Sequence, residues 1–456
     1  MYDLVVIGGG PGGYAAAIRA SQLGGKVALA EAGEIGGTCV NRGCIPTKVW
    51  QHSAGLLYNL RRASEFGIKA VVEELDLNAV VVRKNGVAGD IRMGMEGLLG
   101  NNGVEVVRGH AVLKNAQEID VDGTVLETRK TIIATGSRLD IPDIPGLEEA
   151  VLTTDQFMDI DRVPTSVLVL ESNPMAVEIA NTLSVFGSKV YIITKNSRIL
   201  AHEDHDTSQR IAQSLREQGV ELFLKYAIDA IRPSQNGFEA VLTGPKDQIV
   251  EVEKVLISSR RPNTASIELD QVGVQLNADG SIAVNNSLET SVPGTYAIGD
   301  ATGGWMLSHA ASSMAVTAAE NAMGQAGKFA FHLIPRGIWT IPQVGSVGLS
   351  EEEAEKKGID IEVGDFPYAI NGMAMACNEM TGAVKIISES RYGEILGVHI
   401  VGANATDMVA EAVLAMQLEA TVKELARSIR IHPTFSESVV EAGRDCLDWA
   451  LYLPKR

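Results

Sequence analysis

The chain contains 456 residues, 45% of them hydrophobic, and carries a formal net charge of −18 at pH 7. It is too long for one ordinary domain, and we expect three or four domains with their own cores. The acidic charge argues against a nucleic-acid partner, because a protein that binds a phosphate backbone must replace its counterions with cations.

No targeting or membrane segment is predicted. The first strand begins by Asp3, which leaves no room for a cleavable signal, and no apolar run approaches the ~20 residues that span a bilayer. Cys377 and Cys446 are isolated, which is typical of buried thiols and not of the disulfide scaffold of a secreted domain. We therefore expect a cytoplasmic protein with no membrane partner.

Residues 3–31 predict a complete dinucleotide-binding unit. An apolar strand is followed by the turn "GGGPGG", an alanine-rich helix and a second strand, "KVALAE". Gly8, Gly10 and Gly13 permit a tight turn, close approach of the backbone to a pyrophosphate, and close packing of the helix on the strand. Glu31, at the end of the second strand, is placed to accept hydrogen bonds from an adenosine ribose.

Two cysteines follow directly in "GGTCVNRGCIPTK". On an ideal helix, five positions span about 7.5 Å and point ~140° apart, which is too far for unstrained disulfide geometry. For Cys39 and Cys44 to pair, the segment must be distorted, and we expect the distortion at Gly43. Their place after a nucleotide unit favours a redox pair, whose thiolate chemistry depends on a lowered pKa, over two unrelated thiols.

A second αβ unit opens at Ser166, after a strand ending in Gly136 and the linker "DIPDIPG". Its GxGxxG positions hold Glu171, Asn173 and Ala176, of which only the alanine is tolerated. Side chains at the first two positions obstruct the approach of the backbone, and a carboxylate repels a pyrophosphate. The second cradle is therefore predicted to bind NAD poorly.

Further departures surround the second cradle. Pro174 removes a backbone N–H from the turn, and Thr194 stands where an acid would normally bind the NAD ribose. Ser259 replaces a glycine expected at a second close contact. Lys195 and Arg198 permit an NADP variant, in which cations meet a 2′-phosphate, but the lost glycines weaken that possibility as well.

Taken in order, six motifs resemble the flavoprotein pyridine nucleotide-disulfide oxidoreductases over essentially the whole chain. The motifs are "GGGPGG", "GGTCVNRGCIPTK", "IIATGS", "YAIGD", "MLSHAA" and "HPTFSE". Glutathione and mercuric reductases share this layout, but "GCIPTK" and "HPTFSE" favour the dihydrolipoamide dehydrogenase branch. A mercuric reductase would carry paired cysteines near its C-terminus, where this chain has Cys446.

The resemblance implies an α/β fold with two dinucleotide-binding, Rossmann-like domains and a C-terminal α+β dimerisation domain. The implied boundaries are 1–146 for the first part of the FAD-binding domain, 147–272 for an NAD-binding-like domain with a degenerate glycine motif, 273–335 for a central domain that completes the FAD site, and 336–456 for the interface domain.

The resemblance also implies catalytic roles. Cys44 would lie against the flavin and exchange electrons with it, while Cys39, nearer solvent, would attack and release the substrate disulfide. His432 would be the general base, oriented by Glu437, and an imidazole suits this task because its pKa lies near neutrality. In the family this pair reaches the cysteines of the other subunit, so we expect an obligate homodimer built on residues after about Arg336.

The resemblance implies that the cofactor is FAD, whereas NAD is doubtful. Lys48 would lie near the flavin and pair with Glu178, Asp300 would bind the ribitol, and Met306 to His309 would line the isoalloxazine. The sequence "HEDH" at 202–205 falls at an acidic turn of the family, so we interpret it as a solvated charge run and predict no metal site. The implied FAD-binding residues are Gly8, Gly10, Gly13, Glu31, Gly37, Thr38, Lys48, Ala111, Gly136, Glu178, Asp300, Met306, Leu307 and His309.

We therefore predict an FAD-dependent dithiol-disulfide oxidoreductase that passes electrons between a lipoyl-type dithiol, the Cys39–Cys44 disulfide and FAD, with NAD(H) use impaired or absent. The predicted partner is a lipoyl-bearing carrier protein or a small dithiol or disulfide. One alternative is an ordinary NAD-dependent dihydrolipoamide dehydrogenase that binds NAD through a rearranged loop. A second is a non-catalytic, FAD-holding subunit, against which the retention of Cys39, Cys44, His432 and Glu437 argues.

The tail motif departs slightly from the lipoamide pattern. Arg430 and Ile431 precede His432 where lipoamide enzymes usually show a second histidine and a small residue. This change alters the expected shape and charge of the disulfide entrance. The corresponding hypothesis is that Arg430 favours an anionic or carrier-bound substrate.

Overall fold

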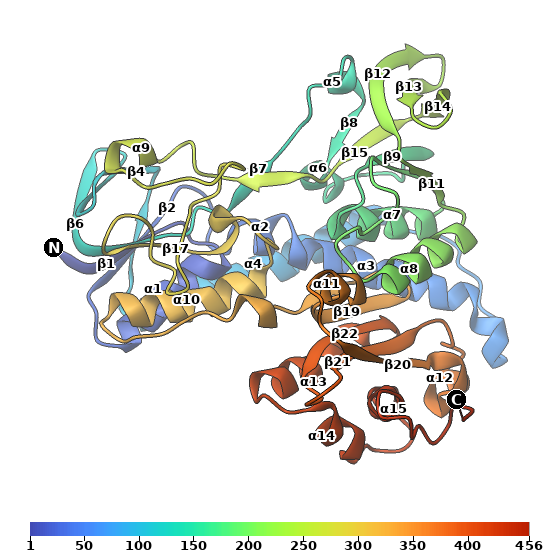
Figure 1. Ribbon diagram of the computed structural model, residues 1–456. Coiled ribbons are helices and arrows are strands. Elements are labelled where there is room, and N and C mark those ends of the chain that lie inside the picture. Colours follow the sequence, from blue (N-terminus) through green and yellow to red (C-terminus); the bar gives the residue numbers. More distant parts are fainter. Residues whose placement is uncertain (456) are drawn as a thin grey trace.

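The computed structural model, which describes residues 1–455, has the predicted α/β fold (Figure 1). Its first sheet has the strand order β3-β2-β1-β6-β5-β4, with β17 also paired to β6. The strands are β1 (Tyr2–Ile7), β2 (Val27–Glu31), β3 (Glu105–Arg108), β4 (Ala111–Asn115), β5 (Glu118–Val121), β6 (Thr124–Ile133) and β17 (Thr295–Ala297). Val5, Val6 and Ile133 are buried, as expected for parallel strands covered on both faces.

Two helices cover one face of this sheet and pack against each other: α1 (Pro11–Gln22) and α10 (Ser308–Ala322). Their alanines permit the close packing, because Ala16, Ala17 and Ala315 add little bulk between the helix axes. The long blue helices of Figure 1 lead from this region beneath the green second unit. The helices between β2 and β3 are α2 (Gly37–Asn41), α3 (Cys44–Arg61), η1 (Ala63–Phe66) and α4 (Leu77–Asn101).

The second sheet is fully parallel, in the order β11-β10-β9-β15-β8. Its strands are β8 (Val151–Thr153), β9 (Ser166–Leu170), β10 (Lys189–Thr194), β11 (Glu221–Leu224) and β15 (Lys254–Ile257). The helices of this unit are α5 (Leu147–Ala150), α6 (Thr154–Phe157), α7 (Pro174–Phe186) and α8 (His205–Glu217). An antiparallel sheet, β12 (Ala227–Ser234), β13 (Gly237–Thr243) and β14 (Gln248–Val252), stands beside it (Figure 1).

A short antiparallel pair, β7 (Ser137–Leu139) with β16 (Arg260–Pro262), links the first two sheets. Between this pair and α10 the chain forms α9 (Leu269–Val272), β17 and η2 (Gly299–Thr302). Because β17 pairs with β6, the chain returns here to the first sheet after completing the second.

The C-terminal part is an antiparallel sheet in the order β18-β19-β22-β21-β20, below the other two units in Figure 1. Its strands are β18 (Arg336–Ile338), β19 (Gln343–Gly348), β20 (Ile361–Pro367), β21 (Ala383–Glu389) and β22 (Ile395–Gly402). Its helical elements are η3 (Phe331–Leu333), α11 (Glu351–Lys356), η4 (Tyr368–Ile370), α12 (Gly372–Ala376), α13 (Ala405–Gln417), α14 (Val422–Arg427) and α15 (Glu437–Asp445). None of the helices in the described part of the chain combines the length and hydropathy that a membrane crossing requires.

Candidate redox site and second cradle

The two cysteines lie on either side of a helix break. Helix α2 ends at Asn41, Gly43 has φ −128° and ψ −110°, and α3 begins at Cys44. The distortion expected at Gly43 is therefore confirmed. Both cysteines are free thiols, and Cys44 Sγ lies 3.2 Å from Ser308 Oγ. Cys44 also occupies the first position of α3, where the helix dipole favours an anion.

The surroundings give the two thiols opposite tendencies. A hydrogen bond from Cys39 lowers the pKa of Cys44, and Ser308 and Lys48 lower it further against the opposing effect of burial. The pKa of Cys39 is raised by the same hydrogen bond to Cys44 and by burial. Cys44 is therefore the more acidic of the two thiols.

Lys48 is held beside the cysteines by groups from two distant parts of the chain. Its Nζ lies 2.9 Å from Glu178 Oε2 of α7 and 3.9 Å from the centre of the Trp339 ring. Glu178 is buried and also accepts hydrogen bonds from Gln51 Nε2 (2.8 Å) and from the Trp339 backbone N–H (2.9 Å). The second unit thus supplies the carboxylate that fixes the Lys48 ammonium.

A cavity of about 310 Å³ contains both cysteines and the first glycine cradle. Gly10 is the N-cap of α1 and has no side chain, and because Pro11 has no backbone N–H, the free N–H groups of the helix begin at Gly12, which also lines the cavity. Gly8 has φ 101°, and a Cβ on Gly13 would overlap the Gly8 carbonyl oxygen. Asp300, whose carboxyl pKa is raised by burial, accepts a hydrogen bond from Ser137 Oγ at 2.6 Å. These features fit the pyrophosphate and sugar of a dinucleotide.

The structure brings most of the predicted FAD-binding residues to this cavity. Those that line it are Gly8, Gly10, Glu31, Gly37, Thr38, Gly136, Asp300 and Met306. Gly13 packs beneath it in α1, and the Lys48–Glu178 pair lies beside its cysteines.

Three predicted residues lie elsewhere. Ala111 begins β4, where it is buried in the core and paired with Val121. Leu307 lines a neighbouring cavity instead. His309 turns outward, with its Nε2 2.7 Å from the carbonyl oxygen of Pro335.

Arg260 is a cavity residue that sequence reasoning missed, whereas Ser308 belongs to the predicted stretch from Met306 to His309. The Arg260 guanidinium donates to Ser137 Oγ at 3.0 Å and Thr38 Oγ1 at 3.3 Å, and desolvation lowers its pKa. Its position directly after the unusual Ser259 could have identified Arg260 from the sequence. Ser308 lies inside the "MLSHAA" motif, but the sequence does not show which of its side chains faces the thiols.

The second cradle differs from the first at the helix N-terminus. Asn173 is the N-cap of α7, and its Oδ1 accepts the hydrogen bond of the Ala176 backbone N–H at 3.0 Å. Its Nδ2 donates to Ser258 Oγ at 2.9 Å. The side chain of Asn173 therefore occupies the position where a helix N-terminus would receive a phosphate.

The rest of the second turn keeps the backbone shape of the first without its glycine. Glu171 has φ 74°, and its N–H donates to the Ile193 carbonyl at 2.9 Å, just as Gly8 donates to Ala30 at 2.8 Å. Thr194 is buried, and its hydroxyl accepts from the Asn196 N–H at 3.2 Å. Glu171 therefore adopts a left-handed backbone conformation that is uncommon for residues other than glycine.

Arg198, considered above for an NADP variant, is already engaged. Its guanidinium forms a two-point pair with Glu352, at 2.7 and 2.5 Å. It also donates to the carbonyls of Ala201 and Glu203, each at 3.3 Å. A 2′-phosphate would have to displace this carboxylate.

The expectation that "HEDH" is a solvated charge run is wrong for its two acids. Glu203 is 3% exposed and Asp204 is fully buried. Glu203 accepts from Arg336 at 2.9 and 3.2 Å and from Ser346 Oγ at 2.6 Å. The acids are buried because strands of the C-terminal sheet bring cations to them, which the local sequence does not show.

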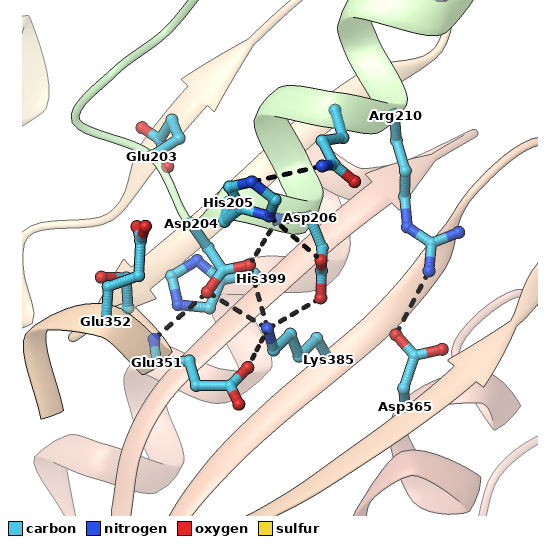
Figure 2. Close-up of polar contacts among 12 residues, drawn as sticks. Glu203, Asp204, His205, Asp206, Arg210, Glu351, Glu352, Asp365, Lys385 and His399 are labelled. Carbon is cyan, nitrogen blue, oxygen red and sulfur yellow. Dashed lines mark hydrogen bonds and ion pairs between the residues drawn. The ribbon is translucent and has the colours of Figure 1, made fainter. Parts of the chain in front are cut away.

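Asp204 lies in a second ion cluster around Lys385 of β21 (Figure 2). The Lys385 ammonium lies 3.2 Å from Asp204, 2.8 Å from Asp206 and 2.5 Å from Glu351. These carboxylates outweigh the desolvation of Lys385 and raise its pKa. Across residues 1–455, no group of three or more His, Cys, Asp or Glu side chains is arranged to hold a metal ion.

The tail motif forms a separate site on the C-terminal domain. His432 Nδ1 lies 3.0 Å from Glu437 Oε1, and Glu437 Oε2 accepts from the Thr434 N–H at 2.8 Å. The His432 side chain is 78% exposed. It lines a cavity of about 500 Å³, and no described residue lines both this cavity and that of the cysteines. Within one chain, the imidazole and the thiols therefore lie in different sites.

Arg430 does not present its charge to solvent. Its guanidinium is paired with Glu411 of α13, and its side chain is only 17% exposed. The exposed neighbours of His432 are instead Ile429 and Ile431. Arg430 nevertheless lines the same cavity as His432, so the hypothesis of an anion-selecting Arg430 stays a prediction.

Comparison with known proteins agrees with this geometry. Residues 2–315 match the family described as pyridine nucleotide-disulphide oxidoreductase, and residues 334–443 match its dimerisation domain. The chain is 37% identical to the dihydrolipoyl dehydrogenase of Thermus scotoductus, over 100% of this chain and 99% of that protein. It is 35% identical to a leghemoglobin reductase of Glycine max, over 98% of this chain and 88% of that protein.

Solved structures of flavoprotein reductases share the fold. LpdA from Mycobacterium tuberculosis superposes with a TM-score of 0.88 at 26% identity, over 97% of this chain and 99% of that one. The HOCl-induced flavoprotein disulfide reductase RclA from Escherichia coli superposes with a TM-score of 0.83 at 28% identity, over 96% and 98%.

Proposed function

The chain belongs to the pyridine nucleotide-disulphide oxidoreductase family, and from this premise we propose how its sites divide the work. It is an FAD-dependent disulfide oxidoreductase of the dihydrolipoyl dehydrogenase type. We propose that it oxidises or regenerates a lipoyl-type dithiol and that its use of NAD(H) is impaired or absent. The observation that carries the second part is the Asn173 side chain at the N-terminus of α7.

FAD would be held by the first cradle. The pyrophosphate would meet the N-terminus of α1 at Gly10, Glu31 would accept from the adenosine ribose, and Asp300 would bind the ribitol. Bound there, FAD supplies the two-electron partner of the cysteines. We propose boundaries of 1–146 and 273–335 for this domain, 147–272 for the second unit and 336–456 for the interface domain.

The dithiol step follows from the division between the two thiols. In the oxidised protein, one sulfur of the substrate attacks Cys39 Sγ, the Cys39–Cys44 bond breaks, and Cys44 leaves as a thiolate. The second substrate sulfur then displaces Cys39, which releases the substrate as a disulfide. Of the two substrate protons, Cys39 keeps one and an imidazole takes the other.

That imidazole is His432 of a second copy of the chain. Glu437 fixes the His432 ring, and the ring is exposed on the domain that matches the family's dimerisation domain. The separate cavities of the imidazole and the thiols within one chain support a homodimer that brings them together across its interface.

Three contacts support the loss of NAD(H) use. Asn173 caps α7, the Glu171 carboxylate stands at the first glycine position, and Thr194 replaces the acid that would bind a ribose. A rearranged loop would have to break the Asn173–Ser258 hydrogen bond as well as the cap. In an ordinary NAD-dependent enzyme, the Asn173–Ser258 hydrogen bond and the Asn173 cap would both have to break before a phosphate could bind at the N-terminus of α7.

An anaerobic titration of the purified flavoprotein tests the proposal. NADH, NADPH and dihydrolipoamide are added separately while the flavin and the thiolate–flavin absorbance bands are followed. We expect dihydrolipoamide to reduce the protein and neither nucleotide to do so. Reduction by NADH at micromolar concentration would show an ordinary dihydrolipoamide dehydrogenase, and no response to dihydrolipoamide would favour a non-catalytic subunit.

A further inference from the structure

We propose that the Ser308 hydroxyl donates a hydrogen bond to Cys44 Sγ when that sulfur leaves the disulfide as a thiolate. Ser308 is then a further catalytic residue of the dithiol step. The inference rests on the proposed function, because it adds a residue to the same site, and it does not depend on whether NAD(H) binds.

The Ser308 hydroxyl lies directly against the redox pair. Its Oγ is 3.2 Å from Cys44 Sγ, which is hydrogen-bond distance, and both residues line the cavity that also contains Cys39. The pKa of Cys39 is raised by its hydrogen bond to Cys44 and by burial, and a hydrogen bond from Ser308 opposes this rise. The hydroxyl is therefore close to both sulfurs of the pair.

The direction of the hydrogen bond follows from the charge on the sulfur. A neutral Cys44 has an S–H of its own that can donate to Ser308, whereas a thiolate has only lone pairs. Next to the thiolate the hydroxyl must be the donor, and hydrogen bonds to charged groups are stronger than those between neutral groups. The contact therefore strengthens as the S–S bond breaks and its electron pair passes to Cys44 Sγ, while Ser308 keeps its proton. Interactions that strengthen as the reaction proceeds are the ones that accelerate it.

Capping of a helix does not explain the hydroxyl. Ser308 is the first residue of α10, but the N-cap of that helix is Leu307, and the cap has no side-chain hydrogen bond. A serine that stabilised the start of the helix would stand one position earlier, with its oxygen accepting from a backbone N–H. The Ser308 oxygen is directed to the cysteines instead.

The backbone before α10 is shaped to bring Ser308 to the thiols. Met306 has φ 48°, a left-handed conformation that is uncommon for residues other than glycine. Met306 and Ser308 line the cavity of the cysteines, whereas Trp305 and Leu307 line the cavity beside the second cradle. Residues in sparsely populated conformations persist where the surrounding structure holds them, and they cluster at functional sites.

A pH titration of the FAD-loaded protein after reduction with dithiothreitol tests the proposal, with the thiolate–flavin absorbance as the signal. The thiolate is present above the pKa of Cys44 and is lost as the pH falls through it, so removal of a donor should move the midpoint upward. We expect Ser308→Ala to raise the midpoint by about one pH unit, and Ser308→Thr, which keeps a hydroxyl, to restore it. The pH profile of Cys44 alkylation by iodoacetamide, measured by mass spectrometry, should shift in the same way.

The matched control is Ser313→Ala, at an exposed serine of the same helix, which should leave the midpoint unchanged. An unchanged midpoint in Ser308→Ala overturns the proposal, and so does an equal rise in Ser308→Ala and Ser308→Thr, which would assign the effect to packing. Neither result affects the proposed function, because dithiothreitol takes the place of the substrate in this titration. Failure of dihydrolipoamide to reduce the unsubstituted protein would instead reject the proposed function, and the midpoints would still decide whether Ser308 donates to Cys44.

Discussion

At the scale of single residues, the Lys48 ammonium adds to the Cys39 and Ser308 hydrogen bonds in lowering the pKa of the Cys44 thiol. It is shared between the Glu178 carboxylate at 2.9 Å and the face of Trp339 at 3.9 Å. Both partners stabilise the cation, and the cation lowers the pKa of the Cys44 thiol. A thiol with a lowered pKa is charged above that pKa and becomes neutral as the pH falls through it.

Replacing this cation should therefore move the titration upward. We expect Lys48→Met to raise the midpoint of the thiolate–flavin absorbance by about one pH unit, measured by pH titration after reduction with dithiothreitol. In the unsubstituted protein the midpoint should lie below the ~8.5 of an ordinary thiol. Lys69→Met, at an exposed lysine, is the control, and an equal shift in both variants would contradict the assignment.

At the scale of elements, α7 connects the second nucleotide turn to the redox site. Its first residues carry the Asn173 cap, and one turn later Glu178 reaches Lys48. The positive φ of Glu171, 74°, shows that the turn still has the shape for which glycine is suited. The second turn therefore differs from the glycine turn of the first cradle in its side chains and not in its backbone conformation.

This arrangement predicts that the nucleotide site can be restored. We expect the double variant Glu171→Gly with Asn173→Gly to increase the rate of flavin reduction by NADH at least about tenfold, because it uncovers the helix N-terminus and removes a repelling charge. Stopped-flow absorbance measures the rate. Ser172→Gly, which loosens the same loop without uncovering it, should have no effect, and a rise in that variant would assign the gain to flexibility.

The ion cluster around Lys385 should contribute more to the free energy of unfolding than an exposed ion pair does. Lys385→Met would leave Asp204, Asp206 and Glu351 without their cation, so we expect the free energy of unfolding to fall by about 3–5 kcal/mol. Lys189→Met, which breaks an exposed pair with Glu221, should cost no more than about 1 kcal/mol. Urea denaturation followed by flavin fluorescence compares the two, and similar losses would contradict the role of burial.

The same elements show what the sequence can and cannot predict. The two strand–turn–helix units and the break at Gly43 depend on residues within a few positions of each other, and glycine and apolar periodicity reveal them. The burial of Glu203 and Asp204 depends on Arg336 and Lys385, which lie 133 and 181 positions away. Arg260 and Trp339 were missed for the same reason, since their partners come from distant parts of the chain.

At the scale of the whole molecule, the proposed active site belongs to two chains. The His432–Glu437 pair and the cysteines occupy separate cavities in each copy. A dimer with the proposed arrangement would contain two sites, each with thiols from one copy and an imidazole from the other.

Mixing two inactive variants tests this arrangement. Cys44→Ser and His432→Gln should each lose turnover of dihydrolipoamide by about 10²-fold or more. When the two are co-expressed with different tags, random pairing should restore about a quarter of the activity, because half of the dimers contain one intact site of two. No restoration in the isolated mixed dimers would place His432 and the thiols of one chain in the same site.

Helix α7 contributes to both the second cradle and the redox site, and this limits which substitutions the protein can tolerate during evolution. Glu171 and Asn173 stand at the glycine positions of the second cradle and contact neither Lys48 nor the thiols, whereas Glu178 pairs directly with Lys48. Substitutions at the second cradle could therefore weaken nucleotide binding, whereas removal of the whole second domain would also remove Glu178 from Lys48. Under the proposed loss of NAD(H) binding, the second domain would still be needed, because it supplies the carboxylate that holds Lys48 beside the thiols of its neighbour.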